Sequence, residues 1–454
     1  MEFEAMVSRQ REFWNTGATR STEWRLIQLK KLEQALEERE GALCAALKAD
    51  LGKAAYESWL SEIGMTLAEL RFARKHLKKW AAAKRRPSAM PLFPASSRVA
   101  PEPYGTVLIM SPWNYPVQLT LVPLISALAA GNCAVVKPSA YAPSVARAVA
   151  ELLGDIFPPE YVSVVQGGRE ENAALLGQNF DYIFFTGSPA VGRTVMAAAA
   201  KHLTPVTLEL GGKSPVIIAP DANIPLAARR IAWGKFLNGG QTCVAPDHVY
   251  IPTRLRDAFV KELAGQIHQL YGADPLAGPD LPKIINEKHF NRVSGLMGSG
   301  RTAVGGRTDP AARRIEPTVL VDVAETDPVM QEEIFGPVLP VLTYDSLDDL
   351  IARQQQKARP LALYLFTGDK TLERRVLSAL PSGGVCVNDT VIHLANPHVP
   401  FGGVGNSGMG ACHGRAGFDT FTHYRTIVRR GKLDLPLRYA PYEGKNLNMV
   451  KKLM

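Results

Sequence analysis

Short apolar runs alternate with helix-like stretches along most of this chain. From Gly105 the runs are GTVLIMS, CAVVKP, YVSVVQG and DYIFFTG, and after LELGG (208–212) they continue with SPVIIAP, HVYIP, PTVLVDV, VLPVLTY and ALYLFTG. Continuous apolar strands separated by helices are typical of a parallel sheet whose two faces are both covered. The alternation therefore predicts an α/β protein with mostly parallel sheets. The break near 209–212 predicts a hinge between two lobes.

The chain is long enough for more than one core. At 454 residues it exceeds the size at which single cores usually stop growing. Residues 1–82 carry apolar residues at three- and four-residue spacing, which indicates amphipathic helices. The segment PSAMPLFPASS (87–97) is rich in Pro and Ser and interrupts this pattern, so we interpret it as a connecting excursion.

The cysteines are scattered along the chain, and no two of them form C-x-x-C. They are Cys44, Cys133, Cys243, Cys386 and Cys412. This spacing argues against a disulfide framework and against a zinc site, and it favours a reducing compartment. We therefore predict a cytoplasmic protein without a metal site.

The apolar and charged segments predict neither an integral membrane segment nor a nucleic-acid partner. Leu119 to Val136 is the most apolar stretch, but it contains Pro123 and Asn132, so we interpret it as a buried helix followed by a buried strand. The N-terminus is acidic, unlike a signal peptide. Part of the net charge of +9 lies in residues 74–86, without a recognisable nucleic-acid-binding module. We interpret this segment as a solvated face of a helix. Weak attraction to a membrane surface is the alternative interpretation.

A glycine loop follows one of the predicted strands. Gly187-Ser188-Pro189-Ala190-Val191-Gly192 comes directly after DYIFFT and opens the next helix. Such a turn lets the backbone and a helix N-terminus approach a phosphate group. A tight strand-to-helix turn with no ligand is the alternative interpretation, which the position within a βαβ series makes weaker.

Two other glycine motifs do not fit nucleotide-binding patterns. Gly211-Gly212-Lys213-Ser214 resembles the end of a P-loop, but Thr207 occupies the position of its first glycine, which excludes P-loop nucleotide hydrolysis. The segment 403–408 matches G-x-G-x-x-G, yet it follows no clear strand and no acidic residue lies at the expected distance after it. We interpret it as a structural glycine loop.

A cysteine and a glutamate form the first candidate catalytic pair. NGGQTC (238–243) places Cys243 in a loop where glycines allow tight backbone packing. A thiol is a weak nucleophile until a base or a lowered pKa makes it a thiolate. Glu209 lies in LELGG at a strand end, where α/β enzymes place functional groups, and a carboxylate in an apolar strand costs free energy unless it is used or paired.

Two further segments carry candidate polar groups. Asn114, in SPWNYP (111–116), follows a predicted strand, and its amide could donate a hydrogen bond to a developing oxyanion. A turn asparagine between two prolines is the alternative. In EEIFGP (332–337), Glu333 and Phe335 are two residues apart in an extended segment and could face the same ligand.

Taken together and in this order, these segments resemble the aldehyde dehydrogenase superfamily. The motifs SPWNYP, KPS, FTGSPAVG, LELGGKSP, GGQTC, EEIFGPV and PFGGVGNSG lie at family-like spacing between about Gly105 and Arg429. The short N-terminal region and the segment HGRAGFDTFTHYRTIV look most like the class 3 branch. That branch acts on medium- to long-chain aliphatic and aromatic aldehydes.

The resemblance implies two Rossmann-like lobes and a small oligomerisation or bridging element. Residues 1–209 would form the NAD(P)-binding domain, with 84–99 as a bridging excursion, and residues 210–400 would form the catalytic domain with the cysteine. Residues 401–454 would form a glycine-rich return segment and a C-terminal bridging tail. A homodimer is also implied.

The resemblance further implies the oxidation of an aldehyde to a carboxylic acid. Cys243 would form a thiohemiacetal, and Asn114 and the backbone N–H of Cys243 would hold its oxyanion. Hydride transfer to nicotinamide would leave a thioester, and Glu209 would activate the water that hydrolyses it. Whether Glu209 serves deacylation, thiol activation or both stays open, and Glu333 is the fallback base.

The other roles concern the cofactor and the substrate. Lys137 would contact the adenosine ribose and Glu333 the nicotinamide ribose, while Tyr115 and Thr242 would line the substrate funnel. The predicted cofactor-binding residues are Ser111, Trp113, Lys137, Ser139, Gly187, Ser188, Gly192, Glu333 and Phe335.

One departure from the family pattern concerns cofactor choice. Many relatives carry Glu in the segment written here Lys137-Pro138-Ser139-Ala140. A carboxylate there would accept hydrogen bonds from the ribose of NAD and repel a 2′-phosphate. Ala140 removes that repulsion, so we predict that NADP is accepted, alone or beside NAD.

Two other functions stay open at this point. The same fold could pass the acyl group to coenzyme A or phosphate, although Glu209 as a water-activating base favours hydrolysis. A non-enzymatic binding or structural protein could also keep the fold, but it would have no reason to keep Cys243, Glu209 and Asn114 together.

Overall fold

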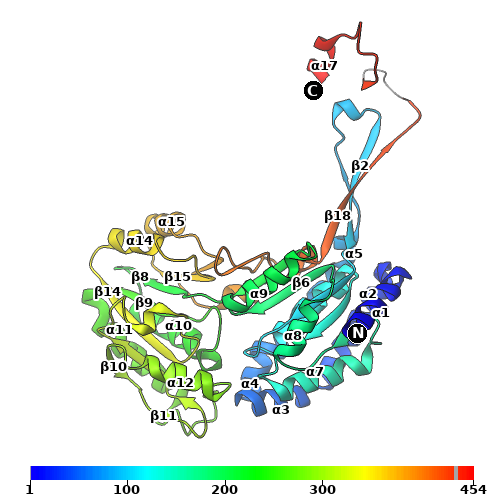
Figure 1. Ribbon diagram of the computed structural model, residues 1–454. Helices are drawn as coiled ribbons and strands as arrows, with labels where there is room; N and C mark the ends of the chain where they lie inside the picture. Colours follow the sequence, from blue (N-terminus) through cyan, green and yellow to red (C-terminus); the bar gives the residue numbers. More distant parts are fainter. Residues whose placement is uncertain (1, 434–437, 454) are drawn as a thin grey trace.

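The computed structural model describes residues 2–433 and 438–453, so residues 434–437 and 454 of the predicted C-terminal tail lie outside the described residues. Two α/β lobes lie side by side, and a long arm of strands projects from one of them (Figure 1). The predicted α/β architecture with mostly parallel sheets is confirmed. Below, the first lobe is the one built on the six-stranded sheet, and the second lobe is the one built on the seven-stranded sheet.

The sheet of the first lobe has five parallel strands and one antiparallel edge strand. Its order is β17 (Gly408–Met409), β7 (Val206–Leu210), β6 (Tyr182–Gly187), β3 (Thr106–Met110), β4 (Cys133–Lys137) and β5 (Val162–Val164). The predicted apolar runs at β3, β4, β5, β6 and β7 are therefore strands.

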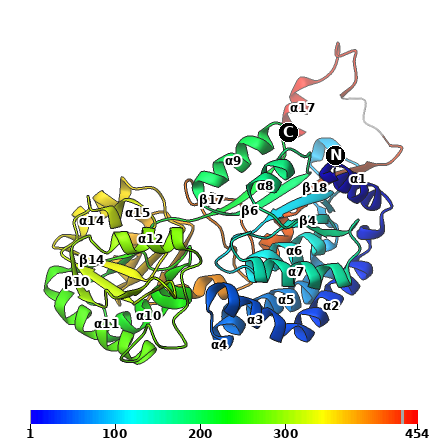
Figure 2. The same ribbon diagram turned by 60° about the horizontal axis from the view of Figure 1, so that its bottom comes forward.

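Helices cover both faces of this sheet, which explains why its strands are apolar on both sides. Alternate residues of β3 show this, since Val107 and Ile109 belong to one core cluster and Leu108 and Met110 to another. The first face packs on α2 (Thr22–Glu38), α3 (Glu40–Leu51), α5 (Gly64–Ala81), α6 (Gln118–Ala130) and α7 (Pro143–Ile156), which Figure 2 shows. The second face packs on α1 (Glu2–Asn15), α8 (Arg169–Leu176) and α9 (Pro189–Ala200).

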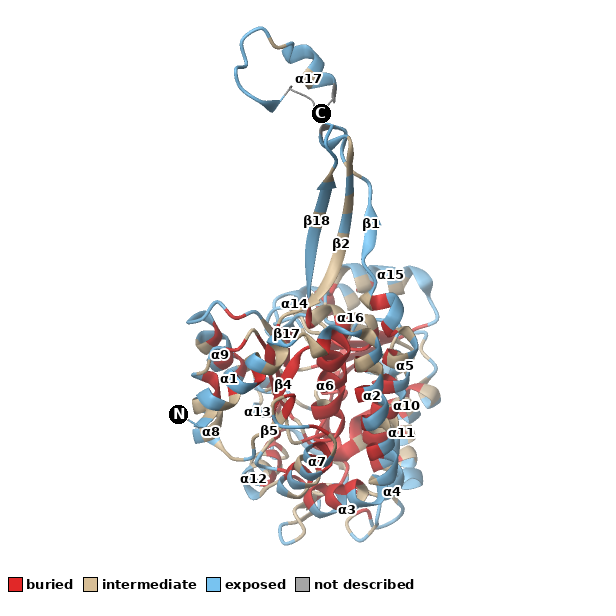
Figure 3. Ribbon diagram, turned by 90° about the vertical axis from the view of Figure 1, so that its right-hand side faces the viewer, coloured by how far each residue is buried: buried red, intermediate tan, exposed pale blue. Residues whose placement is uncertain are grey.

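The most apolar stretch of the chain forms a buried helix followed by a buried strand, as predicted. These are α6 and β4, and α6 is buried along nearly its whole length (Figure 3). None of the helices within the described ranges is long and apolar enough to cross a membrane.

The sheet of the second lobe has six parallel strands and one antiparallel edge strand. Its order is β10 (Arg301–Val304), β13 (Thr318–Val321), β14 (Val338–Tyr344), β9 (His248–Pro252), β8 (Pro215–Ile218), β15 (Ala362–Phe366) and β16 (Gly384–Val387). One face packs on α10 (Ile224–Phe236) and α11 (Arg256–Tyr271). The other packs on α12 (Glu287–Leu296), α13 (Pro328–Gln331), α14 (Leu347–Gln355) and α15 (Lys370–Ala379). A small ribbon of β11 (Thr308–Asp309) and β12 (Arg314–Ile315) completes this lobe.

The arm is a three-stranded antiparallel sheet of β1 (Lys84–Arg86), β2 (Ala95–Pro103) and β18 (Thr422–Arg430). It joins the excursion that follows α5 to the C-terminal part of the chain, and it is mostly exposed or half-buried (Figure 3). At its far end lies α17 (Leu447–Leu453).

The glycine-rich return segment belongs structurally to the first lobe. It adds β17 beside β7, and the following α16 (Gly414–Thr420) packs against α5 and α6. The chain thus crosses from the first lobe to the second between β7 and β8 and returns before β17. The functional division at 1–209, 210–400 and 401–454 remains a prediction.

Candidate active site

The predicted catalytic residues come from both lobes. Glu209 lies on β7 and Asn114 in the loop after β3, so both are at the carboxyl ends of parallel strands in the first lobe. Cys243 lies in the second lobe, between the short helix η4 (Leu237–Gly240) and β9. The carboxyl edge of a parallel sheet is where open α/β folds bind ligands.

The backbone before Cys243 is left-handed at consecutive residues. The φ angles are 54° at Asn238, 61° at Gly239 and 75° at Gly240. A Cβ at Gly240 would lie 2.3 Å from the Gly336 carbonyl oxygen, so only glycine fits there. The loop is fixed to the first lobe because Asn238 Nδ2 donates to the Asn114 carbonyl oxygen at 2.7 Å.

Glu209 and Cys243 line one small cavity of about 30 Å³. That volume is enough for about one or two water molecules. Glu209 is its only carboxylate, and most of the wall is apolar. The lining residues are Leu119, Val122, Pro123, Phe184, Thr186, Glu209, Leu210, Cys243, Leu361, Phe401, Cys412 and His413.

The Glu209 carboxyl group is buried, and no nitrogen or oxygen atom of the described residues donates a hydrogen bond to it; its polar neighbour is the Cys412 thiol. Burial raises the pKa of Glu209 well above its usual range, and the neighbouring Cys412 thiol opposes this. A carboxyl group of this kind stays protonated to higher pH than usual and accepts a proton readily once ionised.

The return loop holds Glu209 in place. Gly408 pairs with Glu209 in the antiparallel bridge between β17 and β7. Its φ is 143°, and a Cβ there would lie 2.2 Å from the Leu208 carbonyl oxygen. The 403–408 loop therefore contributes close backbone packing beside the candidate base, which agrees with its interpretation as structural.

The Cys243 thiol is half-buried and protonated at neutral pH. Burial raises its pKa to about 12, and Glu333 and Glu209 add to this. The site therefore needs a proton acceptor before the thiolate forms, and Glu209 shares its cavity.

Asn114 is buried between the two lobes. Its Nδ2 donates to the Gln241 carbonyl oxygen at 2.9 Å, which uses one of the two amide hydrogens. Asn114 does not line the cavity that contains Glu209 and Cys243, so its contact with a substrate oxygen remains a prediction. Next to it, Tyr115 Oη and Thr242 Oγ1 share a 2.6 Å hydrogen bond, and neither residue lines the cavity with Glu209 and Cys243. Their contact with substrate remains a prediction.

The candidate cofactor residues of the first lobe lie at strand ends. Lys137 ends β4, and its Nζ donates to the Gly167 carbonyl oxygen at 2.7 Å; burial lowers its pKa. Ser111 Oγ is engaged with Thr120 Oγ1 at 2.6 Å, and Ser139 Oγ accepts from the Tyr141 N–H at 3.2 Å. These contacts fix the strand ends near the predicted site.

The glycine loop leads into α9, whose N-terminus is capped by a side chain. Ser188 caps the helix by accepting from the Val191 N–H. A Cβ at Gly192 would lie 2.7 Å from Leu210 Cδ2, and a Cβ at Gly187 would lie 2.5 Å from Phe185 Cζ. The absence of a Cβ at these two glycines leaves room for the Phe185 and Leu210 side chains, which pack against the turn.

Glu333, Phe335 and Trp113 lie together at the boundary of the lobes. Trp113 contacts the Phe335 ring edge-on, with centroids 5.3 Å apart. The Glu333 carboxyl group lies against Gly211, where a Cβ would be 2.0 Å from Oε2, and its Oε1 has no partner among the described residues. Burial raises the pKa of Glu333 to about 8, and Asp247 adds to this.

Several residues near the site were not predicted. Cys412 and Phe401 line the cavity, and buried Lys235 and Asp247 lie near Glu333. Cys412 is one of the scattered cysteines, all of which are free thiols. Nothing in its spacing places it beside Glu209, because that contact arises when the return loop packs on β7. No group of three or more His, Cys, Asp or Glu in the described ranges is arranged to hold a metal.

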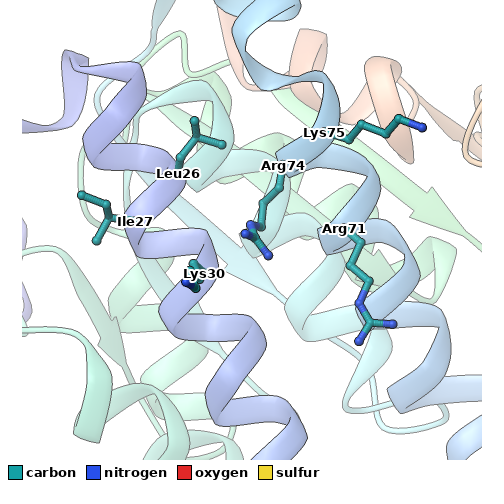
Figure 4. A pocket seen from close by; sticks show the side chains of 6 residues that line it. All are labelled: Leu26, Ile27, Lys30, Arg71, Arg74 and Lys75. Atoms are coloured by element: carbon teal, nitrogen blue, oxygen red, sulfur yellow. The ribbon is translucent and has the colours of Figure 1, made fainter.

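A surface hollow between α2 and α5 lies apart from this site (Figure 4). Its lining residues are Leu26, Ile27, Lys30, Arg71, Arg74 and Lys75. Arg71 pairs with Glu33 and Glu37, and Arg74 pairs with Glu33. The guanidinium groups of Arg71 and Arg74 thus already have carboxylate partners, and we interpret the hollow as part of the surface of two helices joined by ion pairs.

Comparison with known proteins agrees with this geometry. The aldehyde dehydrogenase family model matches residues 2–427. The 4,4'-diaponeurosporen-aldehyde dehydrogenase of Staphylococcus aureus is 47% identical over 436 residues, with 95% of each chain covered. Human aldehyde dehydrogenase family 3 member B1 is 46% identical, with 98% of this chain and 96% of that one covered.

Two further matches extend this result. The rat "aldehyde dehydrogenase, dimeric NADP-preferring" is 43% identical, with 96% of each chain covered. The substrate-bound structure of Staphylococcus aureus AldH superimposes with a TM-score of 0.97 at 45% identity, covering 99% of this chain and 98% of that one. The chain therefore belongs to the aldehyde dehydrogenase family, whose members oxidise aldehydes to acids with NAD(P), and it is an enzyme of the class 3-like branch.

Proposed function

We propose that this enzyme oxidises a medium- or long-chain aliphatic or aromatic aldehyde to its carboxylic acid through a covalent Cys243 intermediate. The observation that carries the proposal is the shared cavity, in which a buried carboxyl group and a thiol from opposite lobes face the same small space. Nucleophile and base within one enclosed site is the arrangement that covalent catalysis needs.

Cys243 attacks the aldehyde carbon and forms a thiohemiacetal. The free amide hydrogen of Asn114 and the backbone N–H of Cys243 stabilise the oxyanion, and the loss of one such donor typically costs about 10²–10³ in rate. When bound, the nicotinamide supplies the hydride acceptor, and hydride loss from the thiohemiacetal leaves a thioester on Cys243.

Glu209 acts as the base that activates water for thioester hydrolysis. Its carboxyl group is the only one that lines the cavity, and the cavity has room for water beside it. Burial raises its pKa well above the usual range of a carboxyl group, which makes the ionised form a stronger base. The same position would let it accept the thiol proton, so one residue could serve both steps.

The residues present fit a dinucleotide. Ser188, Gly187 and Gly192 provide the turn and the helix N-terminus that would bind a pyrophosphate. Lys137 would contact the adenosine ribose, and the orphaned Glu333 Oε1 would accept hydrogen bonds from the nicotinamide ribose, with Trp113 and Phe335 beside it. Ser111 and Ser139 would complete the cofactor site.

Exposed Ala140 supports the use of NADP, alone or beside NAD. It follows Lys137 at the end of β4 and offers no carboxylate to repel a 2′-phosphate. The rat relative named as NADP-preferring supports the same choice. That protein is also named as dimeric, which supports a homodimer; a cytoplasmic location remains part of the proposal.

The apolar cavity wall supports an apolar aldehyde. Leu119, Val122, Phe184 and Phe401 give the reacting group no hydrogen-bonding partner, and Tyr115 and Thr242 would contact the substrate farther out.

A chain-length series of aliphatic and aromatic aldehydes, assayed with both cofactors and with product analysis, tests the proposal. We expect NAD(P)H formation and free acid, with rates that rise from short to medium chains. If NAD(P)H formation required added coenzyme A and the product were acyl-CoA in place of the free acid, the acyl-transfer alternative would be correct. No NAD(P)H from any aldehyde would overturn an enzymatic role.

A further inference from the structure

A buried ion pair lies beneath the loop that carries Asn114. Lys53 Nζ donates to Glu62 Oε1 at 2.6 Å, and both side chains are 0% exposed. Glu62 lies in η2 (Trp59–Ile63), a π-helical turn between α4 (Ala55–Ser58) and α5. Such turns are frequent at functional sites. Well-packed apolar residues often stabilise a core as well as a buried ion pair does, so stability alone does not account for these charges.

The second carboxylate oxygen of Glu62 holds the start of α6. Oε2 accepts from the backbone N–H of Val117 at 2.8 Å and from that of Gln118 at 3.2 Å. The first N–H groups of a helix have no partner within the helix, and negative charge is favourable there. Val117 comes three residues after Asn114, so Glu62 fixes the end of the loop that carries the amide.

Lys53 contacts the same loop through the ring of Tyr115. Its Nζ lies 4.4 Å from the centroid of the Tyr115 ring, a cation–π contact that is strengthened by desolvation. The Tyr115 hydroxyl shares its 2.6 Å hydrogen bond with Thr242, which precedes Cys243 in the chain. The ion pair therefore reaches the loops of both Asn114 and Cys243.

No hydrogen bond joins Asn114 itself to the pair among the residues that the structure describes. Its side chain and carbonyl group are held by the cysteine loop, through Gln241 and Asn238. Its position toward a substrate oxygen thus depends on how the residues after it are anchored. An oxyanion donor acts only within about 2.7–3.1 Å of the developing charge, and a misplacement of about 1 Å can cost about 10² in rate.

We propose that Lys53 and Glu62 are positioning residues for the attack of Cys243 on the aldehyde. They hold residues 114–118 against the cysteine loop so that the free Asn114 amide hydrogen faces the oxyanion. This inference rests on the proposed function. Neither residue lines the cavity that contains Cys243 and Glu209, so we expect their effect on the acylation rate and not on cofactor affinity.

The test compares Lys53→Met, Glu62→Gln and the double variant with the wild type in single-turnover NADPH formation from hexanal and benzaldehyde. We expect each single variant to be slower by about 10–100-fold, with the dissociation constant for NADP within about twofold of wild type. The double variant removes both charges of the pair, and it should be about as slow as the single variants, because residues that act as a unit are not additive.

Asp50→Asn is the matched control. Asp50 is also a buried carboxylate that accepts from two backbone N–H groups at the start of a helix, those of Ser144 at 3.2 Å and Val145 at 2.9 Å in α7. Among the described residues, no hydrogen bond joins Asp50 to the Asn114 loop. We expect a lower Tm but a single-turnover rate within about twofold of wild type.

Amide hydrogen exchange of Val117 and Gln118 provides a readout that needs no turnover, and it should be faster by at least about tenfold in Glu62→Gln. A wild-type single-turnover rate in the folded double variant would show that the pair is only structural and would overturn the inference. An equal slowing in Asp50→Asn would also overturn it, by assigning the effect to general loss of stability. A wild type that oxidises no aldehyde would contradict the proposed function itself. Unchanged amide exchange in Glu62→Gln would independently contradict the role of Glu62 in anchoring the start of α6.

Discussion

Replacing Glu209 with glutamine separates the two halves of the proposed reaction. The substitution keeps the size of the side chain and removes the only carboxyl group that lines the cavity with Cys243. A general base contributes about 10²–10⁴ in rate, which corresponds to about 2.7–5.5 kcal/mol of barrier. Thioester hydrolysis should slow by that factor, while formation of the thioester should continue.

Rapid mixing of Glu209→Gln with aldehyde and NADP measures both halves. We expect a burst of about one NADPH per active site, followed by a steady-state rate that is at least about a hundredfold lower than in wild type. Loss of the burst as well would refute a role confined to deacylation and assign Glu209 to thiol activation. An unchanged steady-state rate would show that another base hydrolyses the thioester, and Glu333→Gln, run in parallel, would identify it.

The same substitution has a consequence for stability. Because burial raises the pKa of Glu209 in the folded protein, folding is favoured while the group is protonated. This contribution is fully present below the unfolded pKa and is lost as pH rises through the folded pKa. The difference in unfolding free energy between Glu209→Gln and wild type should therefore increase with pH, as denaturant titrations at several pH values would measure. A difference that is independent of pH would contradict the burial argument.

Four further outcomes are expected. Cys243→Ala should abolish turnover and still bind NADP in a fluorescence titration; any retained dehydrogenase activity would exclude Cys243 as the nucleophile. The steady-state rate of the wild type should fall as pH decreases, with a midpoint above the usual pKa of a glutamate, since Glu209 acts as a base only when ionised and its pKa is raised; a flat pH profile would count against this. Gly408→Ala should lower stability by about 1–3 kcal/mol and reduce kcat, because alanine is strained at a φ of 143° and its Cβ would lie 2.2 Å from the Leu208 carbonyl oxygen, next to Glu209 in β7. Gly265→Ala in the interior of α11, where a Cβ meets nothing within 4 Å, is the control; it should leave kcat nearly unchanged and raise stability by about 0.5–1 kcal/mol. Ala140→Glu should lower kcat/KM for NADP relative to NAD by about a hundredfold, or about 2.7 kcal/mol; an unchanged ratio would show that this position does not select the cofactor.

The strands of the parallel sheets could be predicted from the sequence because most of them are continuous runs of apolar residues. A parallel strand covered on both faces must be apolar at every position, and β3, β4 and β6 are buried along almost their whole length. Motifs at the carboxyl ends of such strands then indicated where the functional groups would gather. The edge strands β1, β10 and β17 are short or exposed and carry no such signal, which is why they were not predicted.

The sequence by itself therefore determined the α/β class, the two lobes and the identity of Cys243, Glu209 and Asn114 as candidates, because each depends on local patterns of a few residues. Only the tertiary structure decided which groups share one space. The cavity brings Glu209 of β7 beside Cys243 of the other lobe and Cys412 of the return loop, and the Lys53–Glu62 pair meets the Asn114 loop although Glu62 and Val117 are 55 residues apart. Such contacts depend on how the elements pack, and burial then sets the pKa of each group, which no local pattern in the chain specifies.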